Sequence, residues 1–229
     1  MGGADLISVG NFARHSSVWS AVTPTLDEVV RLANSDKSSL GRAVPSLSQP
    51  ARHSLIAETA FLLAKERTSV TKRGNTEVED SARKFLVQLP RSEKLGDPLD
   101  DLEWWEVNEI CDKIMSYTHW MSNVEFSPVV PGCGVVDEAV ADVAIQFQLI
   151  EIKAVNRPFK ALDLRQLLTY VAMFYAKGRN FENVTLLNPR LGDLFSISLD
   201  SLCAGASGKA AVEVLQDLIE WMTGLQVSA

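Results

Sequence analysis

The spacing of apolar residues changes character near residue 124. Before that position, apolar side chains recur every three or four residues, which is typical of amphipathic helices. After it, short β-branched runs interrupted by proline and glycine indicate strands with helices between them. The predicted helices span residues 25–32, 51–66, 77–88, 101–117, 163–177 and 209–222. The predicted strands span residues 124–126, 128–136, 141–147, 149–155, 184–187 and 194–197.

This order of elements predicts an α/β fold in which helices pack on a mixed sheet. We expect residues 1–100 to form a helical N-terminal region and residues 101–229 to form the α/β domain. With 229 residues, of which 46% are hydrophobic, the chain can bury a sizeable core without disulfides or a structural metal.

The composition excludes several classes of protein. No apolar run approaches the ~18 residues of a membrane span, and the N-terminus lacks the basic and apolar regions of a secretion signal. Cys111, Cys133 and Cys203 lie far apart, without the CxxC pair that zinc or an iron–sulfur cluster requires. We therefore expect a cytoplasmic protein with reduced thiols and no membrane partner.

The net charge of −7 opposes simple binding to nucleic acid, because phosphate contacts require basic residues. The distribution of charge is uneven, however. Residues 151–190 hold seven Lys or Arg and three Asp or Glu, a local charge of +4. Such a segment suits a phosphate-facing surface, and solvated charge on a helix is the alternative. The acidic balance also favours a protein partner or a homodimer that supplies part of the binding surface.

Three charged residues lie inside apolar sequence that favours strands: Asp142, Glu151 and Lys153. Side chains alternate between the two faces of a strand, so Glu151 and Lys153 share one face. If the two strands form a hairpin around Gln146 and Phe147, Asp142 lies directly opposite Glu151. That turn contains no Gly, Asn or Asp, the residues that favour a tight hairpin.

This geometry fits phosphodiester hydrolysis. Two neighbouring carboxylates can share one divalent cation, which polarises a phosphate and acidifies a bound water. Lys153 would position that water or stabilise the developing charge. The alternative is a buried ion pair that serves only the fold.

The predicted helix after the strands adds two polar residues to the candidate site. Gln166 and Tyr170 are four residues apart and share a helical face near its N-terminus. Two structural roles are the alternatives. Asp163 and Gln166 have the spacing of a capping box, and Tyr170 can be an amphipathic core residue.

Six residues follow the spacing of a known active-site motif: Asp142, Glu151, Ile152, Lys153, Gln166 and Tyr170. Over residues 124–190 the sequence resembles the PD-(D/E)xK nuclease superfamily, in particular its RecB-like branch. The resemblance implies an αβββαβ restriction-endonuclease-like core, which agrees with the order of elements predicted above.

The resemblance also implies a metal site and an activity. Asp142, Glu151 and the carbonyl of Ile152 would bind Mg²⁺ or Mn²⁺, and Gln166 would orient water or phosphate. The proline of the family's name is absent, since Ala141 precedes Asp142. The implied function is metal-dependent cleavage of DNA in bacterial restriction, repair or anti-phage defence. A non-catalytic subunit that keeps the nuclease fold as an interaction module is the alternative.

Other acidic residues compete for a place in the site. Asp137 is a rival to Asp142 if the strand begins earlier. Many members of the superfamily add an acidic residue from a preceding helix, for which Glu58, Glu106 and Glu109 are the candidates. We expect these three to be structural or solvent-facing, since Glu109 lies opposite the apolar stripe of its helix.

Basic residues follow the last strand of the motif. Arg157, Lys160 and Arg165 lie in or just after the loop that joins this strand to the next helix. We expect them to contact nucleic-acid phosphates, which position a strand without reading its sequence. The sequence leaves open whether the substrate is DNA or RNA and whether cleavage is internal or terminal.

Overall fold

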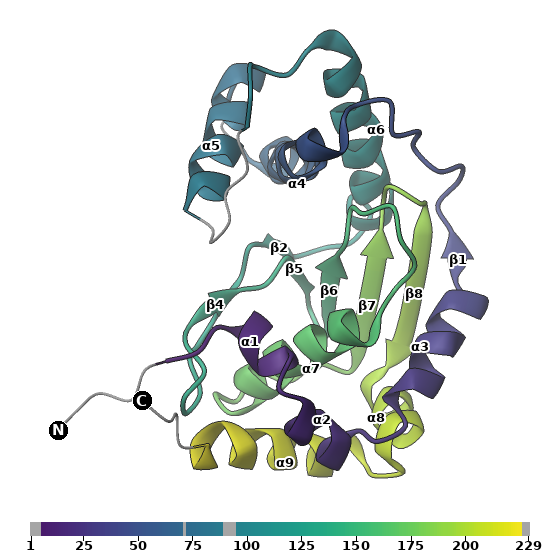
Figure 1. The fold of residues 1–229 in the computed structure, drawn as a ribbon, viewed down its shortest axis with the longest axis vertical. Coiled ribbons are helices and arrows are strands. Elements are labelled where there is room, and N and C mark those ends of the chain that lie inside the picture. Colours follow the sequence, from purple (N-terminus) through teal and green to yellow (C-terminus); the bar gives the residue numbers. More distant parts are fainter. Residues whose placement is uncertain (1–5, 71, 89–94, 226–229) are drawn as a thin grey trace, which may run out of the picture.

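The computed structural model describes residues 6–70, 72–88 and 95–225, which are mainly helical up to α6 and contain most of the strands after it (Figure 1). Its helices are α1 (Val9–Ala13), α2 (Ser16–Val22), α3 (Leu26–Ser35), the 3₁₀ helix η1 (Pro50–Arg52), α4 (His53–Thr68), α5 (Asn75–Val87), α6 (Asp101–Thr118), α7 (Ala161–Tyr175), α8 (Leu199–Ser207) and α9 (Ala211–Gly224). Its strands are β1 (Ser38–Ser39), β2 (Val124–Phe126), β3 (Val129–Val130), β4 (Ala139–Val140), β5 (Val143–Ile145), β6 (Gln148–Ile152), β7 (Asn183–Asn188) and β8 (Asp193–Ser198). Helices α1, α2 and α8 were not predicted from the apolar spacing.

Six of the strands form one mixed sheet in the order β1-β8-β7-β6-β5-β2. Strands β6 and β7 run parallel, whereas every other neighbouring pair is antiparallel. A parallel pair requires a crossover connection, and α7 provides it. The prediction of an α/β fold with a mixed sheet is thereby confirmed.

The prediction of a long strand over residues 128–136 is wrong. Only Val129 and Val130 form a strand there, and they pair with β4 outside the main sheet. Pro131 follows directly and has no N–H to continue the ladder. Cys133 and Val136 then close a turn through two backbone hydrogen bonds of 2.9 Å.

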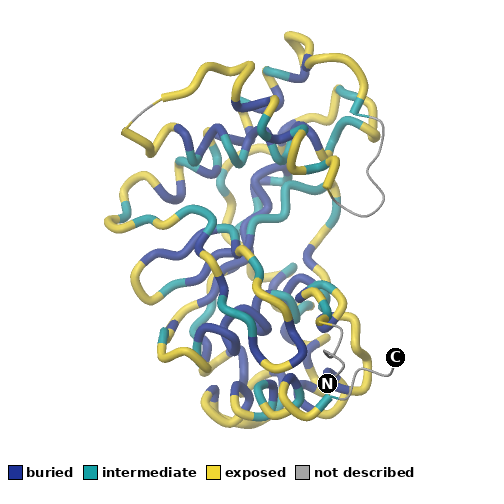
Figure 2. The backbone as a smooth tube through the Cα atoms, turned by 90° about the vertical axis from the view of Figure 1, so that its left-hand side faces the viewer, coloured by how far each residue is buried: buried dark blue, intermediate teal, exposed yellow. Residues whose placement is uncertain are grey.

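Each face of the sheet has its own apolar core. On one face, Ala144 and Leu149 pack with apolar side chains of α1–α3 and α7–α9. On the other face, Val143 and Ile150 pack with those of α4–α6. Successive residues of a strand point to opposite faces, so β5 and β6 contribute to both cores. Figure 2 shows buried backbone in both helical layers and in the strands between them.

Helices from both sides of residue 100, where a boundary was expected, pack against one another. Helices α1, α2 and α3 precede it but contact α7, α9 and α8, which follow it. Helices α4 and α5 also precede it, and they form a single layer with α6. One helical layer therefore combines the first three helices of the chain with the last three, and the other consists of the consecutive helices α4, α5 and α6.

Helix α6 begins with a reciprocal N-terminal cap. The Asp100 carboxylate accepts the N–H of Glu103 at 2.8 Å, and the Glu103 carboxylate accepts the N–H of Asp100 at 3.1 Å. Along the helix, Val107, Cys111 and Ile114 are fully buried, as the predicted apolar stripe requires.

No helix in the described part of the chain, α6 included, is both long and apolar enough to cross a membrane.

A fully buried ion pair joins α6 to the turn between β7 and β8. Glu106 Oε2 accepts a hydrogen bond from Arg190 Nη1 at 2.7 Å, and Oε1 accepts the N–H groups of Leu47 and Ser48 at 2.8 and 2.7 Å. Burial alone would raise the pKa of Glu106, but the hydrogen bonds from Arg190 and Ser48 bring it below its ordinary value. The carboxylate therefore connects three segments of the fold.

We expect Glu106→Ala to lower the free energy of unfolding by about 3–5 kcal/mol, because Arg190 would be left as an unpaired buried charge. Urea denaturation measures this. The matched control is Glu109→Ala, which removes an exposed carboxylate from the same helix and should change the stability by less than about 0.5 kcal/mol. Equal effects of the two substitutions would show that the buried pair does not stabilise the fold.

Candidate active site

The β5–β6 hairpin places two carboxylates opposite each other. Val143 pairs with Ile150 in the sheet, so continuing the same register by one residue sets Asp142 against Glu151. The predicted hairpin and its turn at residues 146 and 147 are confirmed. Gln146 takes a left-handed conformation, with φ of 48°, in place of the glycine that such a turn favours. That conformation costs roughly 1–2 kcal/mol for a non-glycine residue.

The Asp142 carboxylate is anchored to the neighbouring strand. Its Oδ2 atom accepts the backbone N–H of Ile152 at 2.6 Å, where β6 ends. The hydrogen bond fixes the direction of the carboxylate where β6 ends and β5 begins. Among the residues that the structure describes, the other oxygen of Asp142 accepts no hydrogen bond.

A chain of hydrogen bonds connects Glu151 to helix α7. Lys153 Nζ lies 2.5 Å from Glu151 Oε1 and donates a second hydrogen bond to Gln166 Oε1 at 3.0 Å. Gln166 Nε2 in turn donates to the hydroxyl of Tyr170 at 3.0 Å. The structure therefore brings together all four of these predicted site residues. Gln166 does not cap α7, because Asp163 accepts the N–H at the start of that helix.

Burial raises the pKa of both carboxylates. For Asp142 the pKa reaches about 6, although Lys153 and the N–H of Ile152 oppose the rise. For Glu151 it reaches about 8, because the charge of Asp142 adds to the effect of burial. Burial would lower the pKa of Lys153, but the two carboxylates raise it above its ordinary value. Near neutral pH, the pair therefore retains about one proton beside one ammonium group.

The donor set of this site fits a hard divalent cation. Asp142, Glu151 and the carbonyl of Ile152 offer oxygen ligands, which Mg²⁺ and Mn²⁺ prefer. Two facing carboxylates that retain a proton can exchange it for a cation, because metal binding releases protons from its ligands. The described residues contain no group of three or more His, Cys, Asp or Glu side chains arranged to hold a metal. A metal here would therefore depend on two carboxylates, a carbonyl and water.

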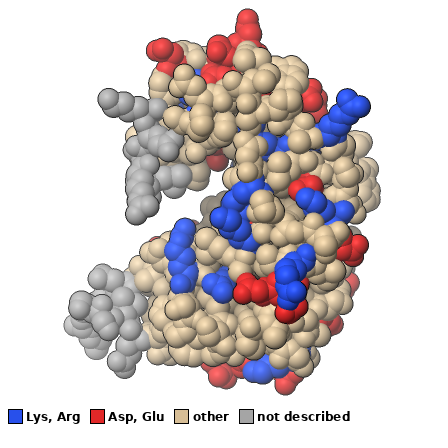
Figure 3. Space-filling view, turned by 45° about the vertical axis from the view of Figure 1, so that its right-hand side comes forward, with Lys and Arg blue, Asp and Glu red and all other residues tan. Residues whose placement is uncertain are grey.

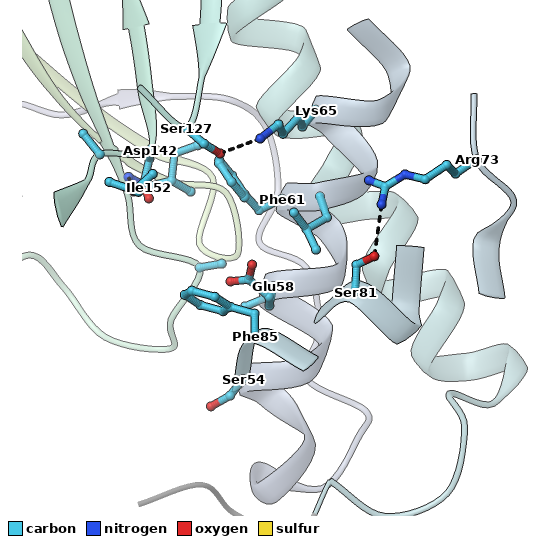
Figure 4. A pocket seen from close by; sticks show the side chains of 15 residues that line it. Ser54, Glu58, Phe61, Lys65, Arg73, Ser81, Phe85, Ser127, Asp142 and Ile152 are labelled. Atoms are coloured by element: carbon cyan, nitrogen blue, oxygen red, sulfur yellow. Dashed lines mark hydrogen bonds between the residues drawn. The ribbon is translucent and has the colours of Figure 1, made fainter. Parts of the chain in front are cut away.

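Glu58 lies closer to the site than expected. Its side chain lines the same cavity as Asp142, and the cavity separates α4 from the ends of β5 and β6 (Figure 4). Burial raises the pKa of Glu58 to about 7, and its charge contributes to the raised pKa of Asp142. We expected Glu58 to have only a structural role, but its carboxyl faces the candidate site.

The other acidic candidates lie outside the site. Asp137 is exposed in the loop between β3 and β4, where its carboxylate accepts the N–H of Glu138. Glu106 forms a buried ion pair with Arg190, and Glu109 is exposed on α6. Asp142, rather than Asp137, is therefore the acidic residue at the end of the hairpin.

The structure does not support two of the three predicted phosphate contacts. Both guanidinium nitrogens of Arg157 bind the carboxylate of Asp163, at 2.7 and 2.9 Å. The guanidinium of Arg165 lies 5.9 Å from the ring of Trp19, on the side of α7 that faces α1 and α2. These contacts hold both side chains in the fold, so only Lys160 remains exposed for phosphate binding.

Most of the local positive charge in residues 151–190 is paired. Lys153, Arg157, Arg179 and Arg190 each form an ion pair with a carboxylate. Carboxylates therefore neutralise four of the seven basic side chains in this segment. Figure 3 instead shows Lys and Arg side chains around the hollow between the α4–α6 layer and the rest of the molecule.

No protein-family model matches the chain, and no curated protein or solved structure is significantly similar to it.

The raised carboxyl pKa values predict how stability depends on pH. In metal-free buffer, the free energy of unfolding should fall between about pH 5 and pH 8. In this range the folded protein keeps protons on Asp142 and Glu151 that the unfolded chain has already released. The free energy of unfolding is therefore greatest below the pKa values of the two carboxyls in the unfolded chain, and it declines as the pH rises through their pKa values in the folded protein. The slope is at most about 1.4 kcal/mol per pH unit for each group.

Urea denaturation at a series of pH values, with EDTA present, measures this slope. Glu151→Gln should make it distinctly shallower, because the amide does not titrate. Glu138→Gln, which changes an exposed carboxylate, is the matched control and should leave the slope unchanged. The account of the site is wrong if Glu151→Gln and the unmodified protein lose stability with pH in parallel.

Proposed function

We propose that the chain is a Mg²⁺- or Mn²⁺-dependent nuclease that hydrolyses phosphodiester bonds of DNA. The observation that carries this proposal is the β5–β6 hairpin, which sets the partly buried carboxylate of Asp142 against the buried carboxylate of Glu151, beside one ammonium group. A structural ion pair needs one carboxylate for each ammonium. The additional carboxylate destabilises the metal-free protein and is explained by a cation that binds there.

The arrangement of elements supports the same function. The succession α6, β2, β5, β6, α7, β7 follows the αβββαβ order of the PD-(D/E)xK superfamily. Helix α6 packs on one face of the sheet and α7 on the other, and β6 and β7 form the parallel pair. Glu151 and Ile152 lie on β6, and Lys153 follows it directly. Asp142 directly precedes β5, and Gln166 and Tyr170 lie on α7.

Each side chain has a chemical task in this proposal. Asp142, Glu151 and the carbonyl of Ile152 would hold the metal, which supplies Lewis acidity and lowers the pKa of a bound water. In the hydrolysis, the water loses one proton as its oxygen forms a bond to phosphorus, the ester P–O bond breaks, and the leaving oxygen takes up one proton, so that the protons balance. The ammonium of Lys153 stabilises the negative charge that develops on the phosphoryl oxygens.

Gln166 and Tyr170 act on this chemistry indirectly. Gln166 Oε1 accepts a hydrogen bond from Lys153, while its amide nitrogen donates to Tyr170. Tyr170 is buried, and burial together with the nearby Glu151 raises its pKa, so the phenol stays protonated. Both are therefore positioning residues that fix the direction of the Lys153 ammonium.

We expect Lys153→Ala to reduce Mg²⁺-dependent cleavage of DNA by about a hundredfold or more, as removal of an electrostatic stabiliser does. The fold should remain, because Glu151 can hold a proton when the ammonium is absent. The thermal midpoint should shift by less than about 4 °C, which corresponds to about 1 kcal/mol for a chain of this size. A gel assay with a mixed pool of DNA substrates and a thermal melt measure the two quantities.

Lys177→Ala is the matched control, since it removes an exposed lysine that follows the C-terminal end of α7 and should retain most of the cleavage. Full activity in Lys153→Ala would exclude the proposed chemistry. If both Lys153→Ala and the similarly sized Lys153→Met unfold, the three charged residues form a structural ion pair instead.

A further inference from the structure

A cavity of about 560 Å³ opens directly beside the candidate site. Asp142 and Ile152 form one end of it, so a molecule held there touches the residues that would bind the metal. Its volume lies within the range of about 300–1,000 Å³ that is typical of small-ligand sites. The cavity is part of the described fold, and no residue of the proposed chemistry fills it.

One continuous face of α4 forms a wall of this cavity. The residues of this face are Ser54, Ala57, Glu58, Phe61, Leu62 and Lys65. They follow the helical spacing of three or four residues, and most are only partly buried in an otherwise buried helix. Helix α5 adds Ser81 and Phe85, which are four residues apart, to the same cavity. Two helices thus turn partly exposed faces toward the proposed cleavage site.

Aromatic and aliphatic side chains make the cavity apolar near its opening. Phe85 is 48% exposed and Val140 is 55% exposed, and both line the cavity. Phe61 is held in place by Phe126, with ring centroids 5.8 Å apart. Figure 4 shows Phe61, Phe85 and the carboxyl of Glu58 on the cavity wall. Aromatic faces that are exposed inside a cavity offer stacking surfaces to a flat ring.

Two cationic groups accompany these apolar surfaces. Lys65 Nζ donates to Ser127 Oγ at 3.0 Å and forms no salt bridge with the described residues. Arg73 donates to Ser81 at 3.0 Å and is paired with Glu66, so its position is fixed (Figure 4). Cations next to aromatic surfaces are the combination that binds single-stranded nucleic acid, whose phosphates and unpaired bases are both accessible.

We propose that this cavity binds an unpaired base of a single-stranded nucleic acid, with the adjoining phosphates directed to Lys65 and to the Asp142 end. The inference rests on the proposed nuclease function. In a duplex the bases are paired and stacked, and a base would have to leave the helix to enter the cavity. The α4–α5 layer stands beside the carboxylates, so single strands are the preferred substrate.

Binding of a fluorescent oligothymidylate about eight nucleotides long, in EDTA, tests the proposal without any cleavage. Phe85→Ala should weaken binding about tenfold, the loss expected for one stacked base. Phe85 is half exposed, so its removal should not unfold the protein. The matched control is Phe147→Ala, which removes a 52% exposed aromatic residue from a different surface and should change the affinity by less than about twofold.

Two further ligands identify what is recognised. An abasic strand of equal length should bind about as weakly as the oligothymidylate binds to Phe85→Ala, and a blunt duplex should bind more weakly than the single strand. The proposal is overturned if Phe85→Ala binds as well as the unmodified protein, or if the abasic strand binds as well as the oligothymidylate. It is likewise overturned if the duplex binds as well as the single strand.

The failure of this inference can be distinguished from failure of the proposed function. If the protein cleaves DNA with Mg²⁺ but Phe85→Ala affects neither binding nor cleavage, the cavity is not the base site and the nuclease remains. If no nucleic acid is cleaved but Phe85→Ala still weakens binding selectively, the cavity binds a base and the nuclease proposal fails.

Discussion

Asp142 and Glu151 lie opposite each other at the ends of β5 and β6, and one ammonium group, that of Lys153, pairs with Glu151. The two negative charges repel each other and burial limits their hydration, which raises the pKa of both carboxyls, so the pair keeps a proton at neutral pH. The neighbouring strand and helix fix the positions of these charged groups. The amide of Ile152 orients Asp142, and Gln166 on α7 orients Lys153. Under the proposed function, a divalent cation would take the place of the retained proton.

Rigid elements hold the carboxylates and the ammonium group where β6 ends and β5 begins. The hairpin sets the carboxylates, the β6–α7 crossover sets Gln166, and the buried pair of Glu106 and Arg190 connects the sheet to the α4–α6 layer. That layer carries Glu58 and the aromatic wall of the cavity. The same packing that buries the second core therefore determines what can approach the carboxylates.

The sequence predicts the parts of the site that depend on local geometry. Strand alternation and a two-residue turn are enough to set Asp142 against Glu151, because both are properties of adjacent residues. Sequence reasoning failed where partners come from distant segments. Arg165 packs on Trp19, and Glu58 reaches the site only because α4 packs over it. The signal for Glu58 was present, since it is the single charge in an apolar stretch of that helix, but its direction depends on tertiary packing.

The most direct test of the central claim is a crystal structure of the protein soaked in Mn²⁺, with anomalous diffraction used to locate the metal. We predict an anomalous peak between Asp142 and Glu151, with oxygen ligands from both carboxylates and from the Ile152 carbonyl at about 2.0–2.6 Å. A fully soaked crystal in which no peak lies between these residues, and in which the Lys153 ammonium still contacts Glu151, would contradict the claim that this site binds a catalytic metal.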